Sequence, residues 1–134
     1  MITHGPPYGR LDRTHTHEAV GCEHLLRAAR RCRPRLHAFG HIHEGWGADR
    51  VVWRGEPGDS VEGEWSRHVE KAEAIPVDDA RVQEERAVFV DVSSDAGDRA
   101  LAFGKETLMV NAAIMSKRYK PTQAPWVVDL DLER

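Results

Sequence analysis

Hydrophobic positions early in the chain repeat with the period of an amphipathic helix. Four small or apolar residues fall at i, i+3, i+4 and i+7 and share one helix face: Cys22, Leu25, Leu26 and Ala29. Pro34 cannot continue such a helix. The next segment, 35–39 (RLHAF), is a short apolar run closed by Gly40, which is typical of a buried strand. This part of the chain therefore predicts a helix followed by a strand.

The first residues predict one more strand ahead of that helix. Residues 1–3 (MIT) read as the end of a buried strand, and 4–10 (HGPPYGR) as the glycine- and proline-rich loop that follows. Strand, loop, helix and strand in this order form a βαβ unit with parallel strands. Ligands of such units bind beyond the carboxyl ends of the strands. We therefore expect His4, after the first strand, and His41, after the second, to lie at the same edge of a sheet.

Three later segments also predict strands: 87–92 (AVFVDV), 106–115 (ETLMVNAAIM) and 124–132 (APWVVDLDL). The last alternates apolar and polar positions, as a half-buried strand does. The intervening segment 48–99 has little periodicity beyond a candidate strand at 51–53. It is also acidic, with 6 basic against 13 acidic residues between 51 and 100. We expect 48–99 to be a largely irregular acidic insertion in an α/β domain that spans residues 1–134.

Composition and charge exclude several classes of protein. The chain has 134 residues, which suits one domain, and a net charge of −3, which argues against binding to nucleic acid or an anionic membrane. No apolar run approaches the roughly 20 residues that span a bilayer, and the first residues lack a secretory signal pattern. Cys22 and Cys32 would lie about 15 Å apart on one helix, too far for a disulfide. Free thiols favour a reducing compartment, and we expect a cytoplasmic protein.

Eight histidines are present, and most have no distinctive context. A lone histidine is usually a surface or core residue, and this applies to His24 on the predicted helix, His37 within a strand and His68 in the acidic segment. His15 and His17 (THTHEAV) resemble the start of the zinc motif H-x-H-x-D-H, but the Asp-His that completes it is absent. We expect this pair to line a loop beside a site at most.

Three histidines share a context that indicates metal binding. His4, His41 and His43 each follow the end of a predicted strand on a glycine-bounded loop; the second loop reads HAFGHIHEGWG. Imidazole is the usual nitrogen ligand for zinc and similar metals, and glycine lets the backbone turn sharply beside an ion. These three residues are the candidate metal ligands. No catalytic or substrate-binding residue is assigned, although Arg10 and Arg13 follow His4 where a phosphate would bind. Asn111 ends a strand at this edge, where a turn role is equally expected.

The motifs THGPP (3–7) and GHIHEGWG (40–47) resemble the calcineurin-like metallophosphoesterases. The nearest branch is that of metallophosphoesterase-domain-containing proteins, whose closing strands the segment 108–132 also resembles. The resemblance covers roughly residues 1–47 and 106–132. It implies a four-layer αββα sandwich of the metallo-dependent phosphatase type, and two divalent metals of the Mn, Fe or Zn type. By resemblance, His4 and His41 bind the second metal and His43 the first. The implied activity is hydrolysis of a small-molecule phosphoester, in this branch a phosphodiester, with a bridging hydroxide attacking phosphorus.

This chain departs from the family pattern in one large respect. The family motifs D-x-H, G-D-x-x-D and G-N-H precede the T-H-G-P-P loop, and none occurs here. The chain therefore resembles the C-terminal half of the enzyme. Three neutral imidazoles supply no negative charge, so we expect at most weak binding of a single ion and no activity of the isolated chain. We also expect an exposed sheet edge that favours self-association.

Two alternatives stay open at this stage. The chain could be a non-catalytic remnant that acts as a binding or regulatory protein, with the acidic segment as its functional part. It could also be a small mononuclear metal protein, in which His4, His41 and His43 converge on one ion.

Overall fold

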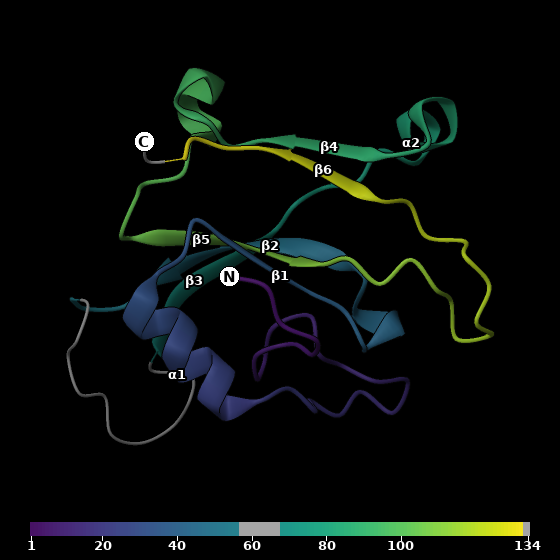
Figure 1. Ribbon diagram of the computed structural model, residues 1–134, viewed down its shortest axis with the longest axis horizontal. Helices are drawn as coiled ribbons and strands as arrows, with labels where there is room; N and C mark the ends of the chain where they lie inside the picture. Colours follow the sequence, from purple (N-terminus) through teal and green to yellow (C-terminus); the bar gives the residue numbers. More distant parts are fainter. Residues whose placement is uncertain (57–67, 133–134) are drawn as a thin grey trace.

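A mixed four-stranded sheet forms the centre of the computed structural model, which describes residues 1–56 and 68–132 (Figure 1). The strands lie in the order β1 (Leu36–Phe39), β5 (Glu106–Asn111), β2 (Gly47–Trp53) and β3 (Val69–Ala74). β1 runs parallel to β5, whereas β2 is antiparallel to both β5 and β3. The carboxyl ends of β1 and β5 therefore lie at one edge of the sheet.

Helix α1 (Glu23–Cys32) covers one face of this sheet. Its buried residues Leu26 and Ala29 pack against one apolar cluster of the strands: Phe39, Val51, Trp53 and Met109. Two of the four residues on the predicted helical stripe thus face the core, which confirms the helix read from the sequence. The next strand, β1, coincides with the predicted run 35–39.

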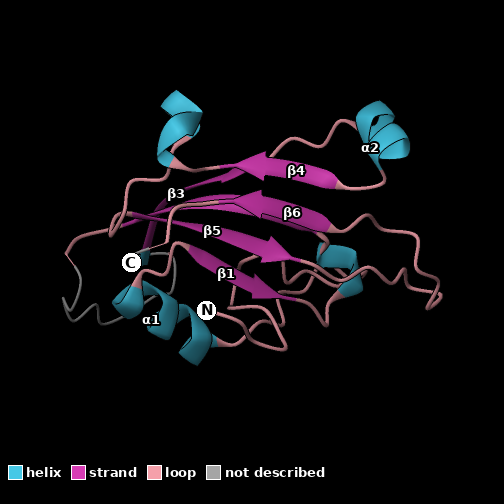
Figure 2. Ribbon diagram, turned by 45° about the horizontal axis from the view of Figure 1, so that its top comes forward, coloured by secondary structure: helices cyan, strands magenta, loops and turns pink. Residues whose placement is uncertain are grey.

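A second sheet packs on the opposite face (Figures 1 and 2). It consists of the parallel strands β4 (Val88–Asp91) and β6 (Trp126–Asp129). Val88 and Val90 join Leu108 and Val110 of β5 in one buried cluster, so apolar contacts hold the two sheets together. The strands predicted at 87–92, 106–115 and 124–132 are confirmed, and the fold is of the α/β type. The four-layer arrangement stays a prediction.

The first residues pair with β1 as the βαβ pattern requires. The N–H of Thr3 donates to the carbonyl of Ala38 at 3.0 Å, and the N–H of Ala38 donates to that of Met1 at 3.1 Å. Ile2 forms a parallel bridge with Ala38. The parallel pairing is confirmed, but the burial expected for this strand is wrong, because Ile2 is 86% exposed.

The expectation that 48–99 is largely irregular is wrong for its described residues. This segment contains most of β2, all of β3 and β4, helix α2 (Asp79–Glu85) and a short 3₁₀ helix, η3 (Ser94–Arg99); positions 57–67 lie outside the described residues. β3 has the sequence VEKAEA and is mostly exposed, so it shows no apolar alternation. Such charged residues are usual on an edge strand, where they discourage pairing with other chains. A solvated edge strand is thus hard to distinguish from a loop in sequence.

Polar residues of this segment also contribute to the sheet. Arg50 on β2 donates from Nη2 to Glu106 Oε2 on β5 at 2.6 Å, and from Nε to Oε1 at 3.1 Å. Such two-pronged pairs are stronger than single ion-pair contacts. Helix α2 begins at Asp78, whose carboxylate accepts from the N–H groups of Ala80 and Arg81. Charged residues that read as loop in sequence therefore stabilise a strand pair and a helix start.

Surface features agree in part with the sequence analysis. Cys22 and Cys32 are free thiols, as predicted. Across residues 1–56 and 68–132, every helix is too short or too polar to cross a membrane.

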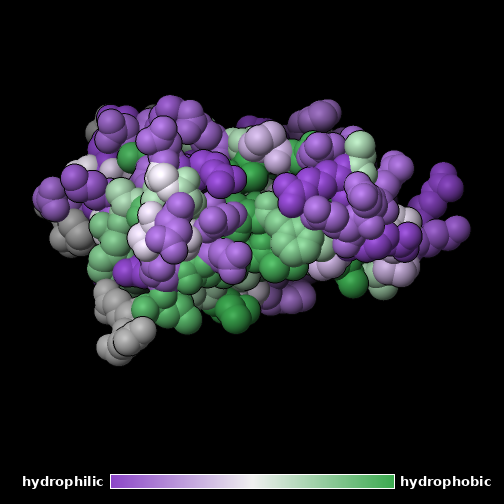
Figure 3. Space-filling model, turned by 90° about the horizontal axis from the view of Figure 1, so that it is seen from above, coloured by the Kyte–Doolittle hydropathy of each residue, from purple (hydrophilic) through white to green (hydrophobic). Residues whose placement is uncertain are grey.

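Hydrophobic residues (green) gather among polar ones on the face that carries the β4–β6 sheet (Figure 3). Phe89 and Val127, which pair in register, are 51% and 42% exposed.

Replacing the buried Leu108 by alanine is expected to lower the free energy of unfolding by about 2–5 kcal/mol, because a cavity would form between the sheets. Urea denaturation measures this change. Leu132→Ala is the matched control, because the side chain of Leu132 is 79% exposed and its loss should change stability by less than about 0.5 kcal/mol. Equal effects of the two substitutions would contradict the assignment of the core.

Candidate functional site

The candidate site lies at the sheet edge where β1 and β5 end. His4 follows the N-terminal strand and His41 follows β1, and the two rings meet there. His4 Nε2 lies 3.0 Å from His41 Nδ1, so one ring donates a hydrogen bond to the other. Their ring centroids are 4.7 Å apart. The prediction that these two histidines share one edge is confirmed.

The backbone around His41 holds the ring in place. His41 has φ 70°, in the left-handed region that non-glycine residues seldom adopt. The N–H of Gly40 donates to the carbonyl of His4 at 3.0 Å, and the N–H of Ile42 donates to that of Gly40 at 2.8 Å. These bonds fix the turn and stabilise the unusual conformation. Strained backbone of this kind is common at functional sites.

His43 lies at the start of a 3₁₀ turn, η1 (His43–Gly45), and its orientation is fixed from a different loop. Its Nδ1 lies 3.1 Å from the carbonyl oxygen of Ser116. A carbonyl only accepts, so Nδ1 carries the proton and Nε2 of the neutral ring keeps a lone pair. The Tyr119 ring meets the His43 ring edge-on at 5.4 Å, and Gln123 donates to the His43 carbonyl at 2.9 Å. A backbone carbonyl hydrogen-bonded to one ring nitrogen is usual for a histidine that binds metal through the other.

A surface hollow of about 570 Å³ adjoins this edge. Its lining comes from three loops and includes two of the three candidate ligands. The lining residues are His15, His41, His43, Glu44, Lys117 and Tyr119. A neighbouring hollow of about 580 Å³ shares His15, His43, Glu44 and Lys117 and extends to Arg13 and His17. His15 and His17 therefore lie beside the candidate site, as expected from their sequence context.

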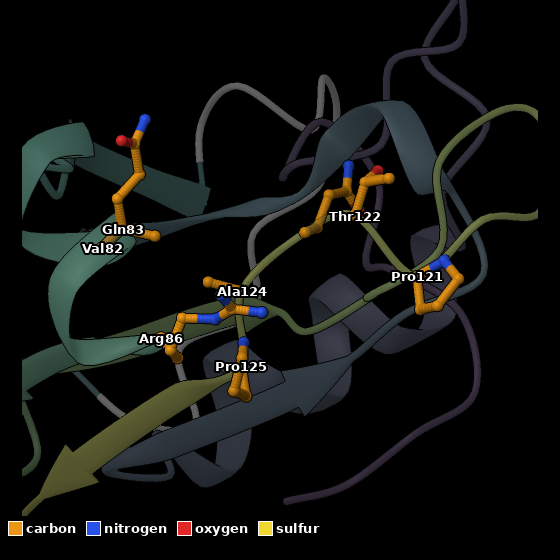
Figure 4. Close-up of a pocket in the computed structure, with 8 residues that line it drawn as sticks. Val82, Gln83, Arg86, Pro121, Thr122, Ala124 and Pro125 are labelled. Atoms are coloured by element: carbon orange, nitrogen blue, oxygen red, sulfur yellow. The ribbon is translucent and has the colours of Figure 1, made fainter.

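Another groove, of about 550 Å³, lies between α2 and the segment 121–125 (Figure 4). Its lining contains Arg86 and Gln83 with proline, threonine, valine and alanine residues, and none of the lining residues is a histidine, cysteine or acid. Gln123 lines this groove as well as the hollow beside His43. The residues suited to binding metal therefore line the hollow beside His43 and not this groove.

Glu44 is the acidic residue of the histidine hollow. Its Oε1 lies 3.6 Å from His15 Nδ1 and 3.9 Å from Lys117 Nζ. A backbone N–H hydrogen bond, aided by the positive charges of Lys117 and His15, lowers the pKa of Glu44. The carboxylate is therefore ionised at neutral pH, where Lys117 is its cationic neighbour.

The donor atoms fit a divalent metal in part. Two nitrogen ligands of one tetrahedral zinc ion, each about 2.0–2.1 Å from the metal, lie roughly 3.3–3.4 Å apart. The His4–His41 separation of 3.0 Å is that of a hydrogen bond, and the two rings would have to move apart slightly to share one ion. Within the described part of the chain, however, no group of three or more His, Cys, Asp or Glu side chains could hold an ion. The mononuclear alternative, in which three imidazoles converge, gains no support from this geometry.

The buried side chain of Asn111 joins the segments around the site. Its Nδ2 donates to the carbonyls of Leu11 at 3.0 Å and Ile42 at 2.8 Å, and its Oδ1 accepts from the N–H of Ala113 at 3.1 Å. Gly45 packs so closely here that a Cβ would lie 1.9 Å from the Leu11 carbonyl oxygen. Asn111 thus has the turn role that the sequence suggested. Its hydrogen bonds also join the loop after His4 to the turn of His41 and His43.

His37, on β1, supports the strand that carries His4. Its Nε2 lies 2.9 Å from Thr3 Oγ1, which donates to the carbonyl of Gly5 at 2.9 Å. The Thr3 hydroxyl must then accept from His37, so Nε2 carries the proton. Burial, and secondarily the charge of the N-terminal amine, lowers the pKa of His37 to about 4. His37 is thus a neutral core histidine, as expected for a lone histidine within a strand.

The two arginines after His4 are both engaged with protein groups. Arg10 Nη1 lies 3.7 Å from Asp49 Oδ2, and burial raises the pKa of Asp49, although Arg10 partly offsets this effect. Arg13 donates to the carbonyl of His17 at 2.6 Å. Arg13 still lines the second hollow, whereas neither described hollow beside the histidines includes Arg10.

Sequence reasoning missed several residues of this edge: Glu44, Ser116, Lys117, Tyr119 and Gln123. Glu44 directly follows His43, so its position was a usable signal. The other four come from the loop after β5, and that loop reaches the site because β5 is parallel to β1. Periodicity in the sequence does not reveal the direction in which a strand pairs.

Comparisons with known proteins give partial matches. The human protein named Metallophosphoesterase domain-containing protein 1 is 57% identical over 49 residues, which cover 35% of this chain. UPF0046 protein T07D4.2 of Caenorhabditis elegans is 46% identical over 48 residues, also 35% of this chain. Probable rhamnogalacturonate lyase C of Emericella nidulans is 46% identical over 55 residues, or 40% of this chain. No family model and no solved structure matches the chain.

These matches span small parts of the relatives. The chain covers 15% of the length of the human protein, 12% of the worm protein and 5% of the fungal one. The human and mouse relatives, which match equally, carry metallophosphoesterase in their names. Part of this chain therefore resembles a metallophosphoesterase-type hydrolase.

Asn111→Asp is expected to lower the free energy of unfolding by about 3 kcal/mol, because a carboxylate cannot donate to the carbonyls of Leu11 and Ile42 and would repel them. Chemical denaturation measures the loss. Gln83→Glu makes the same amide-to-acid change on the exposed surface of α2 and should cost less than about 0.5 kcal/mol. A similarly small cost at Asn111 would contradict the linking role of its amide.

The lowered pKa of His37 predicts a pH-dependent stability. The unfolded chain binds a proton at this residue near pH 6.5, whereas the folded chain binds it near pH 4. The contribution of His37 is therefore complete above pH 6.5 and is lost as the pH falls from 6.5 to 4. In His37→Gln, which keeps a donor but binds no proton, the decrease in urea midpoint between pH 7 and pH 5 should be smaller. His24→Gln, at an exposed position on α1, should keep the wild-type decrease; an unchanged decrease in His37→Gln would refute the assignment.

Proposed function

We propose that this chain contributes histidine ligands to the dinuclear metal site of a phosphodiester hydrolase. In this proposal, His4 and His41 hold one divalent ion and His43 holds a second. The proposal draws its fold expectation, a four-layer αββα sandwich, from the resemblance of the THGPP and GHIHEGWG segments to metallophosphoesterases. The name shared by the human and mouse relatives supports the same reaction class.

One observation carries the proposal: two imidazole nitrogens lie 3.0 Å apart at the edge where His43 presents its own ring. An imidazole pair at this separation has donor atoms in reach of one ion. The Ser116 carbonyl occupies Nδ1 of His43, which leaves Nε2 as the ligand atom. In this proposal the histidines serve as a pair plus a single ligand, which is the division that the resemblance to metallophosphoesterases implies for two metals.

Divalent ions held there would polarise the phosphoryl oxygens of an ester and increase the acidity of a bound water. The chain's own residues hold the histidines in position for this. His37 and Thr3 anchor the strand that carries His4. Asn111 joins the loop after His4 to the turn that bears His41 and His43.

The charge of the donor set limits what these residues do alone. Neutral imidazoles do not offset the charge of two divalent cations, and Glu44 is already paired with His15 and Lys117. Imidazole ligands also favour Zn²⁺, Cu²⁺ or Ni²⁺ over Mn²⁺ or Mg²⁺. We therefore propose that the 134-residue chain by itself binds a single ion weakly and hydrolyses phosphodiesters poorly or not at all.

Zinc titration by calorimetry tests the ligand assignment. We expect one weak site, with affinity reduced about tenfold or more in His4→Ala or His41→Ala, because each removes one of two direct ligands. His24→Ala removes an exposed histidine of α1 and should leave zinc affinity unchanged. Zinc affinity that is insensitive to both His4→Ala and His41→Ala would overturn the assignment.

Two further measurements address the reaction class. Inorganic phosphate should bind more tightly when zinc is present, and His41→Ala should remove that gain in affinity. A phosphate affinity that does not change on addition of zinc would argue against a phosphoester site at the metal. Turnover of bis(p-nitrophenyl) phosphate is expected to be marginal with zinc or manganese. Rapid metal-dependent turnover that His41→Ala abolishes would instead show that the chain is active by itself.

A further inference from the structure

The loop after β5 forms a tight turn beside the candidate metal ligands. The N–H of Ser116 donates to the carbonyl of Lys120 at 2.8 Å, and the N–H of Tyr119 donates to that of Ser116 at 2.9 Å. Met115 and Pro121 bridge the two arms of the loop. The same Ser116 carbonyl receives the hydrogen bond from His43. The turn therefore has a fixed position relative to His43.

Tyr119 lies at the tip of this turn with most of its ring in solvent. Tyr119 is 75% exposed, and its φ of 56° lies in the left-handed region of backbone conformation. The Tyr119 ring meets the His43 ring with their centroids 5.4 Å apart. Tyr119 also lines the hollow that His41 and His43 line, so the turn places an exposed aromatic ring beside the candidate ligands. An aromatic ring held in this way can stack on another ring.

Basic side chains lie in and next to the hollow. Lys117 lines it together with the acidic Glu44, and the turn contains two more basic residues, Arg118 and Lys120. Lys117 Nζ contacts the Glu44 carboxylate at 3.9 Å, with 59% of its side chain exposed. An exposed contact at this distance is weak, so the ammonium group can turn to an incoming anion at little cost.

We propose that this hollow binds phosphoesters whose leaving group contains an aromatic ring, with Lys117 contacting the phosphate and Tyr119 stacking on the ring. This inference rests on the proposed function for its phosphoester class, and it adds a leaving-group subsite to that site. The geometry supports it because the ring of Tyr119 and the imidazole of His43 are adjacent. A phosphate held by Lys117 beside His43 would have Tyr119 within reach of its ester group, because all three residues line the same hollow.

Binding of two small monoesters to the 134-residue chain without metal tests the subsite. Phenyl phosphate and methyl phosphate have the same charged group and differ in the ring, and NMR chemical-shift titration measures both affinities. We expect phenyl phosphate to bind about fivefold more tightly or better, as stacking of one ring on an aromatic side chain predicts. Since no metal is added, this preference can be present even if the zinc titration of His4 and His41 fails, and the reverse also holds.

Variants at exposed positions separate the two contacts. Tyr119→Ala should lower the affinity for phenyl phosphate to that for methyl phosphate, whereas Tyr119→Phe should keep the preference. Lys117→Ala should weaken both probes by a similar factor, and Lys105→Ala, an exposed lysine at the other end of β5, should change neither. Equal affinities for the two probes, a preference that survives Tyr119→Ala, or the absence of saturable binding would each overturn the proposal.

Discussion

The buried amide of Asn111 is the constraint on which the arrangement of the candidate site depends. Its two donated hydrogen bonds go to Leu11, in the loop after His4, and to Ile42, between His41 and His43. A buried amide that loses its partners is costly, so the two segments are held at fixed positions relative to the end of β5. Gly45 lies so close to the Leu11 carbonyl that a side chain at position 45 would not fit between the two segments.

Strand direction decides which other residues reach this edge. The N-terminal strand and β5 both pair in parallel with β1, so three chain segments end on the same side of the sheet. The loop after β5 brings Ser116 to His43, and its backbone carbonyl fixes which ring nitrogen is free. Because a backbone group does this, the chemical identity of Ser116 matters less than the path of the loop. The packing of α1 on Phe39 and Met109 keeps these strands in place.

The electrostatics of the edge are unusual for a metal site. The proposed ligands are histidines, whose imidazoles carry no negative charge, and the acidic residue of the adjoining hollow, Glu44, pairs with His15 and Lys117. The described residues therefore combine metal-binding nitrogens with basic side chains, a combination that attracts anions more readily than it retains cations. The proposed dinuclear site would need carboxylates in addition to these histidines; among residues 1–56 and 68–132, no group of three or more His, Cys, Asp or Glu side chains is placed to hold an ion.

Local sequence patterns determined α1, β1, β4, β5 and β6, and with them the meeting of His4 and His41, because each depends on residues a few positions apart and on the chain order of a βαβ unit. They did not reveal β3 or α2, since exposed charged segments have no apolar alternation. The tertiary structure alone decided how His43 is oriented, and that Lys117 and Tyr119 adjoin it. Those contacts join residues about 75 positions apart, and the energy of strand pairing, which no local window of sequence contains, sets them.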